Sequence, residues 1–237
     1  VADPVGSLSS SFTMSAQVIL ADKDYVRQLN SIFKKVGLEI DGIVPTTLAE
    51  RNLILDKNEL HDNIAIIDVG AENTDVGVFE GSTYVYTNSI PVGGENITND
   101  IALVLNIEKE EADKLKRQYG LALKSFIDND NDIILNTCKD NNKNKIIKSS
   151  ELIEIIEARI EDMFLIINKD LNNQGIKSRI NNVILTGQGI VNISKSDVAG
   201  KINLNIPVKI STGRLIGTTR PAYRTAYALV RYIASRP

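Results

Sequence analysis

The stretch Ile64-Ala-Ile-Ile-Asp-Val-Gly-Ala-Glu-Asn-Thr-Asp-Val-Gly-Val-Phe79 is typical of a strand, a tight turn and a second strand. The run Ile64 to Ile67 is short, apolar and unbroken, which predicts a strand buried on both faces. Asp68 ends the run at the strand's carboxyl end, where open α/β sheets place ligands. Gly70 permits a sharp reversal of the chain. These residues alone leave two interpretations open: an ordinary hairpin, or a turn that holds a phosphate with Mg²⁺.

The composition is that of an ordinary globular protein. The chain has 237 residues, 43% hydrophobic and 24% charged, which is enough for a hydrophobic core. A net charge of -3 gives no reason to expect nucleic acid, whose binders carry a basic face. A single cysteine, Cys138, excludes an internal disulfide framework, and the single histidine, His61, argues against histidine-based chemistry. Because no signal peptide or membrane-length apolar run is present, we expect a cytoplasmic protein.

The rest of the chain alternates between strand and helix patterns, which predicts an α/β fold. Strands are expected at 12–21, 38–44, 83–90, 182–187 and 207–210, with a hairpin formed by 132–135 and 146–147. Helices are expected between Asp22 or Asp24 and Gly37, from Pro45 to near Leu55, after a cap at Asn96 or Thr98, and at 109–119, 149–172, 195–202 and 223–234.

Three segments, in this order, resemble the second lobe of the actin-like ATPase fold. They are Asp68-Val-Gly70, Gly93-Gly94-Glu95-Asn96-Ile97-Thr98 and Leu185-Thr186-Gly187-Gln188-Gly189. Within that superfamily the chain is most similar to the bacterial cell-division protein FtsA. Pro91 to Asp100 is the most family-specific segment, and Pro221-Ala-Tyr-Arg-Thr-Ala226 extends the match, which covers essentially the whole chain.

The resemblance implies an actin-like, ribonuclease H-like α/β lobe with a mixed sheet flanked by helices. A smaller α/β subdomain and a partial N-terminal subdomain are expected beside it. Residues 1–55 would be the remnant of an inserted small subdomain with the crossover, and 56–237 the second lobe, with an outer subdomain at roughly 92–180. We therefore expect a fragment, lacking an earlier lobe with the first phosphate loop and a later amphipathic membrane helix.

The resemblance also implies ATP and Mg²⁺ as ligands. Asp68, Gly70 and Thr74 match the second phosphate loop, and Asp68 would be an outer-sphere Mg²⁺ partner. Ala71 and Glu72 stand where the family has glycines. Because Glu72 adds bulk and negative charge, it would impair phosphate binding unless its side chain points to solvent.

Two further segments resemble nucleotide contacts of the family. Asp113 and Lys116, one helical turn apart, match a ribose-contacting pair. The turn Gly187, Gln188 and Gly189 matches the adenosine side, and Gly94 lies at a helix N-terminus, which favours nearby negative charge. A solvated helix face and simple turn glycines are the alternative interpretations. No catalytic residue is predicted.

Arg159 matches a segment of the family's outer subdomain, which receives the acidic C-terminal tail of the tubulin-like division protein FtsZ. An exposed arginine could pair with the carboxylates of that tail, although a solvated helix charge is an equal interpretation.

The predicted function is that of a septal divisome scaffold. It would bind ATP with at most weak ATPase activity, polymerise, and link FtsZ filaments to the inner face of the cytoplasmic membrane. Its membrane contact would be peripheral, through a C-terminal helix absent from this chain. Two alternatives remain: a related actin-like component of a pilus or secretion assembly, and a sugar or acetate kinase. The kinase is disfavoured because no catalytic acid or substrate-binding insertion is identified.

Overall fold

The computed structural model describes Gly6, Leu8, Ser10, Ser11, Thr13 and Ala16 together with residues 18–55, 58–135, 145–211 and 221–234. The chain divides into two compact units, Val1–Ile43 and Val44–Pro237. The division falls before the helix α2 (Thr46–Ile54), whereas the predicted N-terminal remnant extends over residues 1–55 and includes this helix. Each unit is described separately.

The first unit contains one helix, α1 (Lys23–Lys35), among its described residues. The carboxylate of Asp22 caps it by accepting a hydrogen bond from the Tyr25 amide at 2.8 Å, as expected. The helix ends where Gly37 adopts a φ of 77°, and the Leu38 amide donates to the Phe33 carbonyl oxygen at 3.0 Å. This bond is typical of a glycine-terminated helix.

The two strands predicted in the first unit are not observed. Residues 18–21 and 38–44 form no strand, whereas Phe12, Met14, Ser15 and Gln17 lie outside the described residues. A strand needs a neighbour to accept and donate its ladder hydrogen bonds. The described part of this unit offers no such neighbour.

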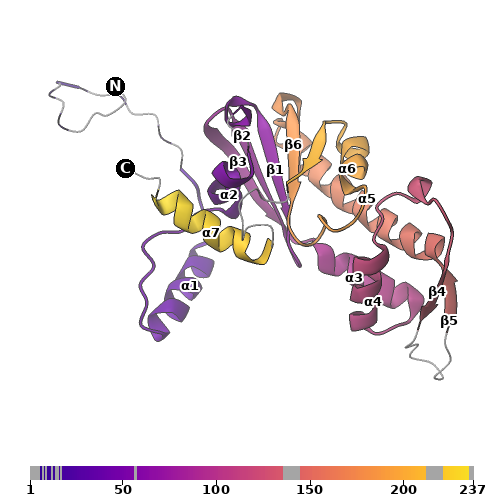
Figure 1. Cartoon of the computed structure of the whole chain (residues 1–237). Coiled ribbons are helices and arrows are strands. Elements are labelled where there is room, and N and C mark those ends of the chain that lie inside the picture. Colours follow the sequence, from indigo (N-terminus) through magenta and orange to yellow (C-terminus); the bar gives the residue numbers. More distant parts are fainter. Residues whose placement is uncertain are drawn as a thin grey trace. The chain divides into compact units, whose positions relative to one another are not determined.

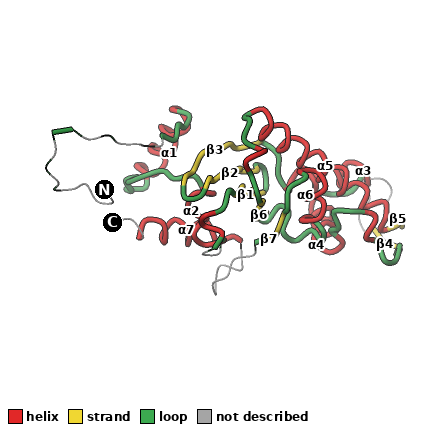
Figure 2. Tube along the Cα trace, turned by 90° about the horizontal axis from the view of Figure 1, so that it is seen from above, coloured by secondary structure: helices red, strands yellow, loops and turns green. Residues whose placement is uncertain are grey.

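The second unit is built on a mixed five-stranded sheet with the order β3-β2-β1-β6-β7 (Figure 2). Its strands are β1 (Ile64–Val69), β2 (Thr74–Glu80), β3 (Thr83–Ile90), β6 (Asn182–Thr186) and β7 (Val208–Ile210). The central strand β1 pairs antiparallel with β2 and parallel with β6. The predicted strand, turn and strand are therefore confirmed, and Ile64 to Ile67 are fully buried.

Helices cover both faces of this sheet, as Figure 1 shows. Ile64 and Ile66 of β1 pack into a cluster with α2 and α7 (Pro221–Ala234). Ala65 and Ile67 point to the other face and its larger cluster. That cluster contains α3 (Gly94–Leu105), α4 (Lys109–Tyr119), α5 (Ser149–Asn173) and α6 (Ser196–Leu204). The two-residue alternation of β1 thus supplies both layers of the core.

A separate antiparallel hairpin, β4 (Asp132–Leu135) with β5 (Lys145–Lys148), leads into α5. Its tip, including Cys138, lies outside the described residues. Short 3₁₀ turns at Glu59–His61, Lys124–Phe126 and Lys177–Arg179 complete the unit. Within the described residues, every helix is too short or too polar to cross a membrane.

The predicted cap of α3 is wrong. Neither Asn96 nor Thr98 caps the helix, because it begins at Gly94 with Gly93 as the N-cap. Asn96 instead accepts a hydrogen bond from the Gly93 amide at 2.9 Å through its side-chain oxygen. This reverse contact, in which the third helical residue bonds the cap amide, stabilises the start of the helix.

Candidate functional site: a cleft at the carboxyl ends of β1 and β6

A cleft of about 370 Å³ lies where the β1–β2 turn, the start of α3 and the turn after β6 meet. Eight of the nine residues predicted to contact a nucleotide line it: Asp68, Gly70, Gly94, Asp113, Lys116, Gly187, Gln188 and Gly189. The fold therefore brings together residues that are up to about 120 positions apart in the sequence, at the sheet edge where α/β proteins place ligands.

Thr74 is the ninth predicted residue, and it does not line the cleft. Its side chain is buried, and its hydroxyl donates a hydrogen bond to the Val92 carbonyl oxygen at 2.7 Å. Thr74 thus anchors the loop that precedes α3. Its role in the described structure is to position that loop.

Backbone contacts hold the three loops of the cleft together. The Gly94 amide donates to the Gly70 carbonyl oxygen at 3.0 Å, and the Gly189 amide donates to that of Val69 at 2.8 Å. A Cβ added at Gly94 would lie 2.6 Å from the Cα of Gly189, so this approach requires glycine. The amides of Gly94 and Gly189 are therefore both used by hydrogen bonds within the fold.

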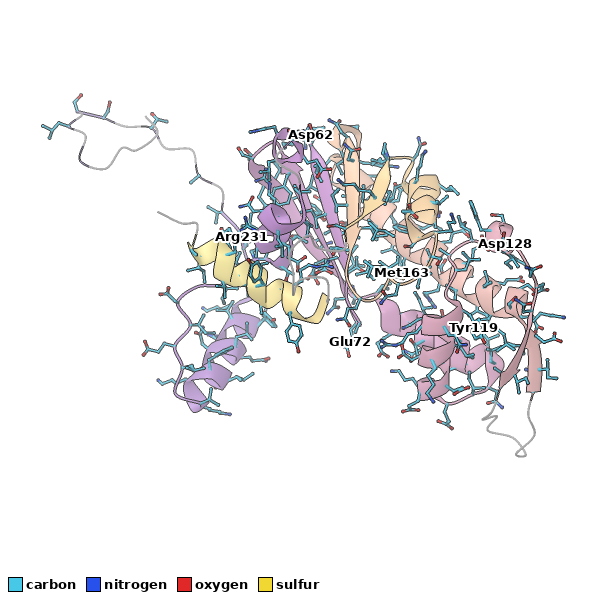
Figure 3. The ribbon with its side chains drawn as sticks, viewed as in Figure 1. Asp62, Glu72, Tyr119, Asp128, Met163 and Arg231 are labelled. Carbon is cyan, nitrogen blue, oxygen red and sulfur yellow. The ribbon has the colours of Figure 1, made fainter. Side chains whose placement is uncertain are left out.

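The β1–β2 turn keeps its extra negative charge away from the cleft. The turn is closed by a hydrogen bond of 2.8 Å from the Gly70 amide to the Asn73 carbonyl oxygen. Ala71 lines the cleft, whereas the Glu72 side chain is exposed at the turn (Figure 3) and is not part of the lining. The effect of Glu72 on phosphate binding stays a prediction.

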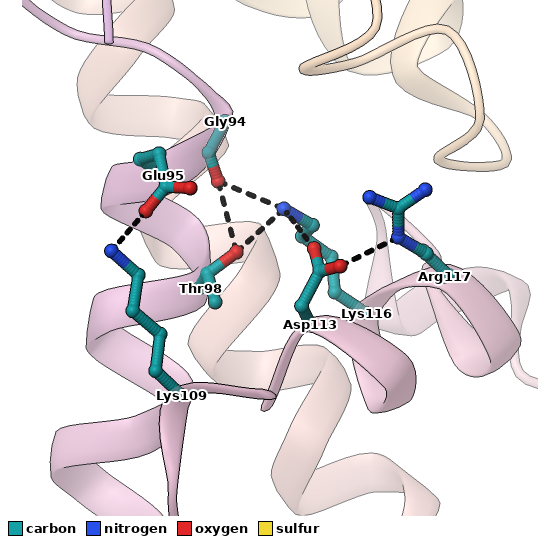
Figure 4. A network of polar contacts seen from close by, with 7 residues as sticks. All are labelled: Gly94, Glu95, Thr98, Lys109, Asp113, Lys116 and Arg117. Carbon is teal, nitrogen blue, oxygen red and sulfur yellow. Dashed lines mark hydrogen bonds and ion pairs between the residues drawn. The ribbon is translucent and has the colours of Figure 1, made fainter. Parts of the chain in front are cut away.

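Asp113 and Lys116 belong to a polar network between α4 and the first turn of α3 (Figure 4). The Lys116 ammonium donates to the Gly94 carbonyl oxygen at 3.0 Å and to the Thr98 hydroxyl at 2.6 Å, and it lies 3.1 Å from Asp113. An ammonium has three donors, so all three are engaged. Lys116 therefore braces the start of α3, and in this arrangement it has no further donor for a ribose.

The second carboxylate oxygen of Asp113 accepts a hydrogen bond from Arg117 at 2.6 Å. Burial raises the pKa of Asp113, but the hydrogen bonds from Arg117 and Lys116 outweigh it, so that the pKa lies below its usual value. Asp113 is therefore ionised at neutral pH. Arg117 lines the cleft beside it with a mostly exposed side chain.

The floor of the cleft contains two charged residues that the sequence analysis missed. Glu50 of α2 and Arg224 of α7 are each 2% exposed, and both line the cleft. Burial and the neighbouring Asp68 raise the pKa of Glu50 to about 7, although Arg224 and Thr225 oppose the shift. A buried polar atom without a hydrogen-bond partner destabilises a fold by about 1–3 kcal/mol, so buried charges at this floor lower the stability of the protein.

Asp68 also lines the cleft and interacts electrostatically with Glu50 and Arg224. Burial raises its pKa to about 6, with a further contribution from Asp75, while Arg224 lowers it. Asp75 stands directly opposite Asp68 in the β1–β2 ladder, which explains the repulsion. The carboxylates on the floor thus have higher pKa values than isolated ones.

Helical spacing could have identified both missed residues. Glu50 lies on the same face of α2 as the buried Leu53 and Ile54, three and four residues later. Arg224 precedes the buried Ala228 by four residues on α7. A charge on an apolar stripe indicates a buried polar group with a structural or functional reason for its position.

Arg159 differs from the expectation of an exposed charge. Its side chain is 27% exposed, and its guanidinium makes two hydrogen bonds with Asp100 of α3, at 2.5 and 3.0 Å. This paired geometry ties α5 to α3. Arg159 is thus half-buried rather than fully exposed, and its charge is paired with Asp100; its binding of a partner stays a prediction.

The cleft suits a hydrated divalent cation better than a metal held directly by side chains. Within the described residues, no group of three histidine, cysteine or acidic side chains could hold a metal ion. Carboxylates such as Asp68 and Glu50 can accept hydrogen bonds from the waters that Mg²⁺ retains. The side chains of the floor therefore fit a cation that arrives with its own waters and a phosphate ligand.

The chain has the fold of the actin-like ATPases. The structure resembles MreB5 of Spiroplasma citri bound to ADP, with a TM-score of 0.73 and 19% identity over 90% of this chain and 67% of that one. It also resembles the MamK double helical filament, with a TM-score of 0.67 and 16% identity over 92% and 66%. The predicted fold class is confirmed.

Sequence comparison identifies the family within this class. The model of the family described as cell division protein FtsA matches residues 65–228. The FtsA proteins of Bacillus subtilis and Pseudomonas aeruginosa are 29% and 24% identical to the chain, each over 98% of its length. The chain belongs to the FtsA family. It spans about half the length of these relatives, 52% and 57%.

Proposed function

We propose that this chain supplies one wall of an ATP site in an FtsA-type division scaffold. The observation that carries the proposal is the convergence of eight predicted nucleotide residues on one cleft. The similar MreB5 structure is bound to ADP, which supports a nucleotide as the ligand. In this proposal the cleft is the phosphate and ribose half of a site that another lobe completes.

Each residue of the wall has a distinct role in the proposal. Asp68 would accept hydrogen bonds from the waters of Mg²⁺, and the cation would neutralise the phosphates. Asp113, ionised and half-buried, would accept bonds from the ribose hydroxyls, with Lys116 holding its carboxylate in place. The turn at Gly187, Gln188 and Gly189 would lie against adenosine.

The bound nucleotide would control the assembly of filaments, and ATP hydrolysis would not be the main purpose of the protein. Closing two lobes around ATP favours the conformation that binds it, and this shift can bias filament contacts. We propose that the resulting filaments link FtsZ to the inner face of the cytoplasmic membrane, where the divisome forms the septum. The family membership supports this role, and the filament formed by the similar MamK supports self-association.

The nucleotide proposal is tested by calorimetry of Mg·ATP with the complete natural protein. Asp68→Asn is expected to weaken binding by about tenfold, the loss of roughly one charge-assisted hydrogen bond. Asp62→Asn is the matched control, because Asp62 lies just before the opposite end of β1 (Figure 3). Equal affinity of the Asp68 variant and the wild type would count against the site.

The division role is tested with the C-terminal tail peptide of FtsZ. Binding of the immobilised peptide to the complete protein supports the scaffold. Failure to bind, with ATP binding intact, would shift weight to a pilus or secretion component on the same fold. Phosphate transfer to a small acceptor would instead favour a kinase.

A further inference from the structure

Glu50 and Arg224 form a buried pair of opposite charges at the floor of the cleft. They come from α2 and α7, which pack together on one face of the sheet. Neither side chain reaches bulk solvent, since each is 2% exposed. Their polar atoms must therefore find partners within the protein or in a ligand that enters the cleft.

Several of these atoms have no hydrogen-bond partner among the residues that the structure describes. One Glu50 oxygen accepts a hydrogen bond from the Thr225 hydroxyl at 3.1 Å, but its Oε2 is buried and unpaired. Arg224 donates from Nη1 to the hydroxyl of Thr186, while its Nε and Nη2 are buried and unpaired. Among the described residues, no ion pair joins Glu50 to Arg224. Within the described part of the chain, the floor thus offers two unpaired donor nitrogens and one unpaired acceptor oxygen.

The chemistry of these atoms selects a ligand. Two N–H groups of a guanidinium fork match two oxygens of a phosphate. The carboxylates of Glu50 and Asp68 would repel a bare anion, however, because together they outweigh the single charge of Arg224. A divalent cation bound to the phosphate removes this repulsion, and its water can donate to Glu50.

We propose that Arg224 and Glu50 form a subsite for the terminal phosphate of a Mg²⁺-complexed polyphosphate. Arg224 contacts the phosphate oxygens, and Glu50 accepts a hydrogen bond from a water of the cation. The subsite rests on the proposed function, in which a nucleotide binds in this cleft. The subsite gives the nucleotide a positively charged contact, Arg224 of α7. Because Glu50 of α2 binds only through a water of the cation, the affinity for the nucleotide should depend on Mg²⁺.

Calorimetry with ATP and AMP, each with Mg²⁺ or with EDTA, tests the subsite in the complete natural protein. Arg224→Met is expected to weaken Mg·ATP by about tenfold or more, with about threefold or less for AMP, because only the terminal phosphate loses its partner. Arg179→Met is the control. Arg179 pairs with Glu80 on the surface and does not line the cleft.

Glu50→Gln tests the cation half of the subsite. The amide keeps the size of the side chain but loses its negative charge, so Mg²⁺ should improve ATP affinity several-fold less than in the wild type. If Arg224→Met alone does not fold, the double variant Glu50→Gln with Arg224→Met is used in its place. The double variant removes both charges, and removing both partners of a buried pair is often tolerated.

The outcomes separate this inference from the proposed function. If Arg224→Met or the double variant binds Mg·ATP within about threefold of the wild type, the floor is filled by water and the subsite is wrong. If the wild type binds no nucleotide, the proposed function fails, and Mg²⁺-tripolyphosphate then tests the subsite alone. If the wild type binds Mg²⁺-tripolyphosphate and Arg224→Met does not, the subsite is supported. If the wild type does not bind Mg²⁺-tripolyphosphate, the subsite is overturned.

Discussion

The ammonium of Lys116 donates a hydrogen bond to the carbonyl oxygen of Gly94 at 3.0 Å, so two predicted nucleotide residues bind each other. Lys116 also bonds Thr98 and Asp113. The lysine therefore joins two helices whose ends form the wall of the cleft. Its removal should affect the stability of the fold as well as ligand binding.

We predict that Lys116→Met lowers the free energy of unfolding by about 1–3 kcal/mol, because it leaves the half-buried acceptors without a donor. Lys114→Met is the matched control on the same helix. Lys114 is mostly exposed and lies 3.6 Å from Glu111, so its loss should change stability by about 0.5 kcal/mol or less. Urea unfolding measures both, and equal effects would show that the network contributes nothing.

The turn after β6 gives a second prediction. Gly187 has a φ of 95°, and an added Cβ would lie 2.2 Å from the Val69 carbonyl oxygen. Gly175 has a φ of 65° with nothing within 4 Å of an added Cβ. Gly175→Ala therefore tests the backbone conformation alone and should cost about 1–2 kcal/mol.

Gly187→Ala combines a left-handed backbone with a steric clash. We expect it to cost about 1–3 kcal/mol more than Gly175→Ala, because overpacking adds to the conformational term. Thermal unfolding of the two variants measures the difference. If both lose the same stability, the contact between the β6 turn and β1 is loose enough to accept a methyl group.

The sheet could be predicted because its signals are local. The run Ile64 to Ile67 indicated a strand buried on both faces, and each of these residues is fully buried. The strand predicted at 38–44 is not observed, because a local pattern does not show whether a neighbouring strand is present. Strand preference reflects packing against neighbouring strands, and the described residues supply no partner for this segment.

The charged groups of the fold could not be placed from local patterns. The Thr225 hydroxyl bonds Glu50 across 175 positions of sequence, and Arg159 meets Asp100 across 59. The partner of each charge is known only once the helices are packed. Spacing could mark Glu50 as buried, but only the tertiary structure shows that Arg224 lies beside it.

Arg159 provides a third prediction that separates a structural role from a partner role. Its paired hydrogen bonds with Asp100 should give a coupling energy of about 1–2 kcal/mol in a double-mutant cycle of Arg159→Met and Asp100→Asn. Lys124 and Glu154, an exposed pair that involves the same helix α5, should show a clearly smaller coupling, because water screens their charges. Chemical unfolding of the four variants in each cycle measures both energies.

A partner role for Arg159 makes a different prediction. Arg159→Met would then reduce binding of the acidic FtsZ tail while leaving unfolding unchanged. Reduced stability with unchanged peptide binding would instead assign Arg159 to the α3–α5 contact. If Arg159→Met lowers both the stability and the binding of the peptide, the partner binds a surface whose shape the Arg159–Asp100 ion pair maintains.

The raised pKa of Glu50 gives the last prediction. The pKa moves from an ordinary 4.5 to about 7 on folding, so between these values the folded state holds a proton that the unfolded chain releases. Stability from this group is therefore present at low pH and is lost as the pH rises toward 7. Asp68, with a pKa of about 6, contributes in the same direction.

Glu50→Gln should remove most of this dependence, because the amide mimics the protonated acid at every pH. We expect the variant to be more stable than the wild type at pH 8 by about 2–3 kcal/mol and nearly equal to it at pH 4.5. Glu110→Gln, at an exposed position on α4, should leave the profile unchanged. Urea unfolding from pH 4.5 to 8 measures the three curves. A wild-type curve that rises across this range, with a flatter curve for Glu50→Gln, would mean that Glu50 is ionised in the folded protein, held by Arg224 more strongly than burial opposes it.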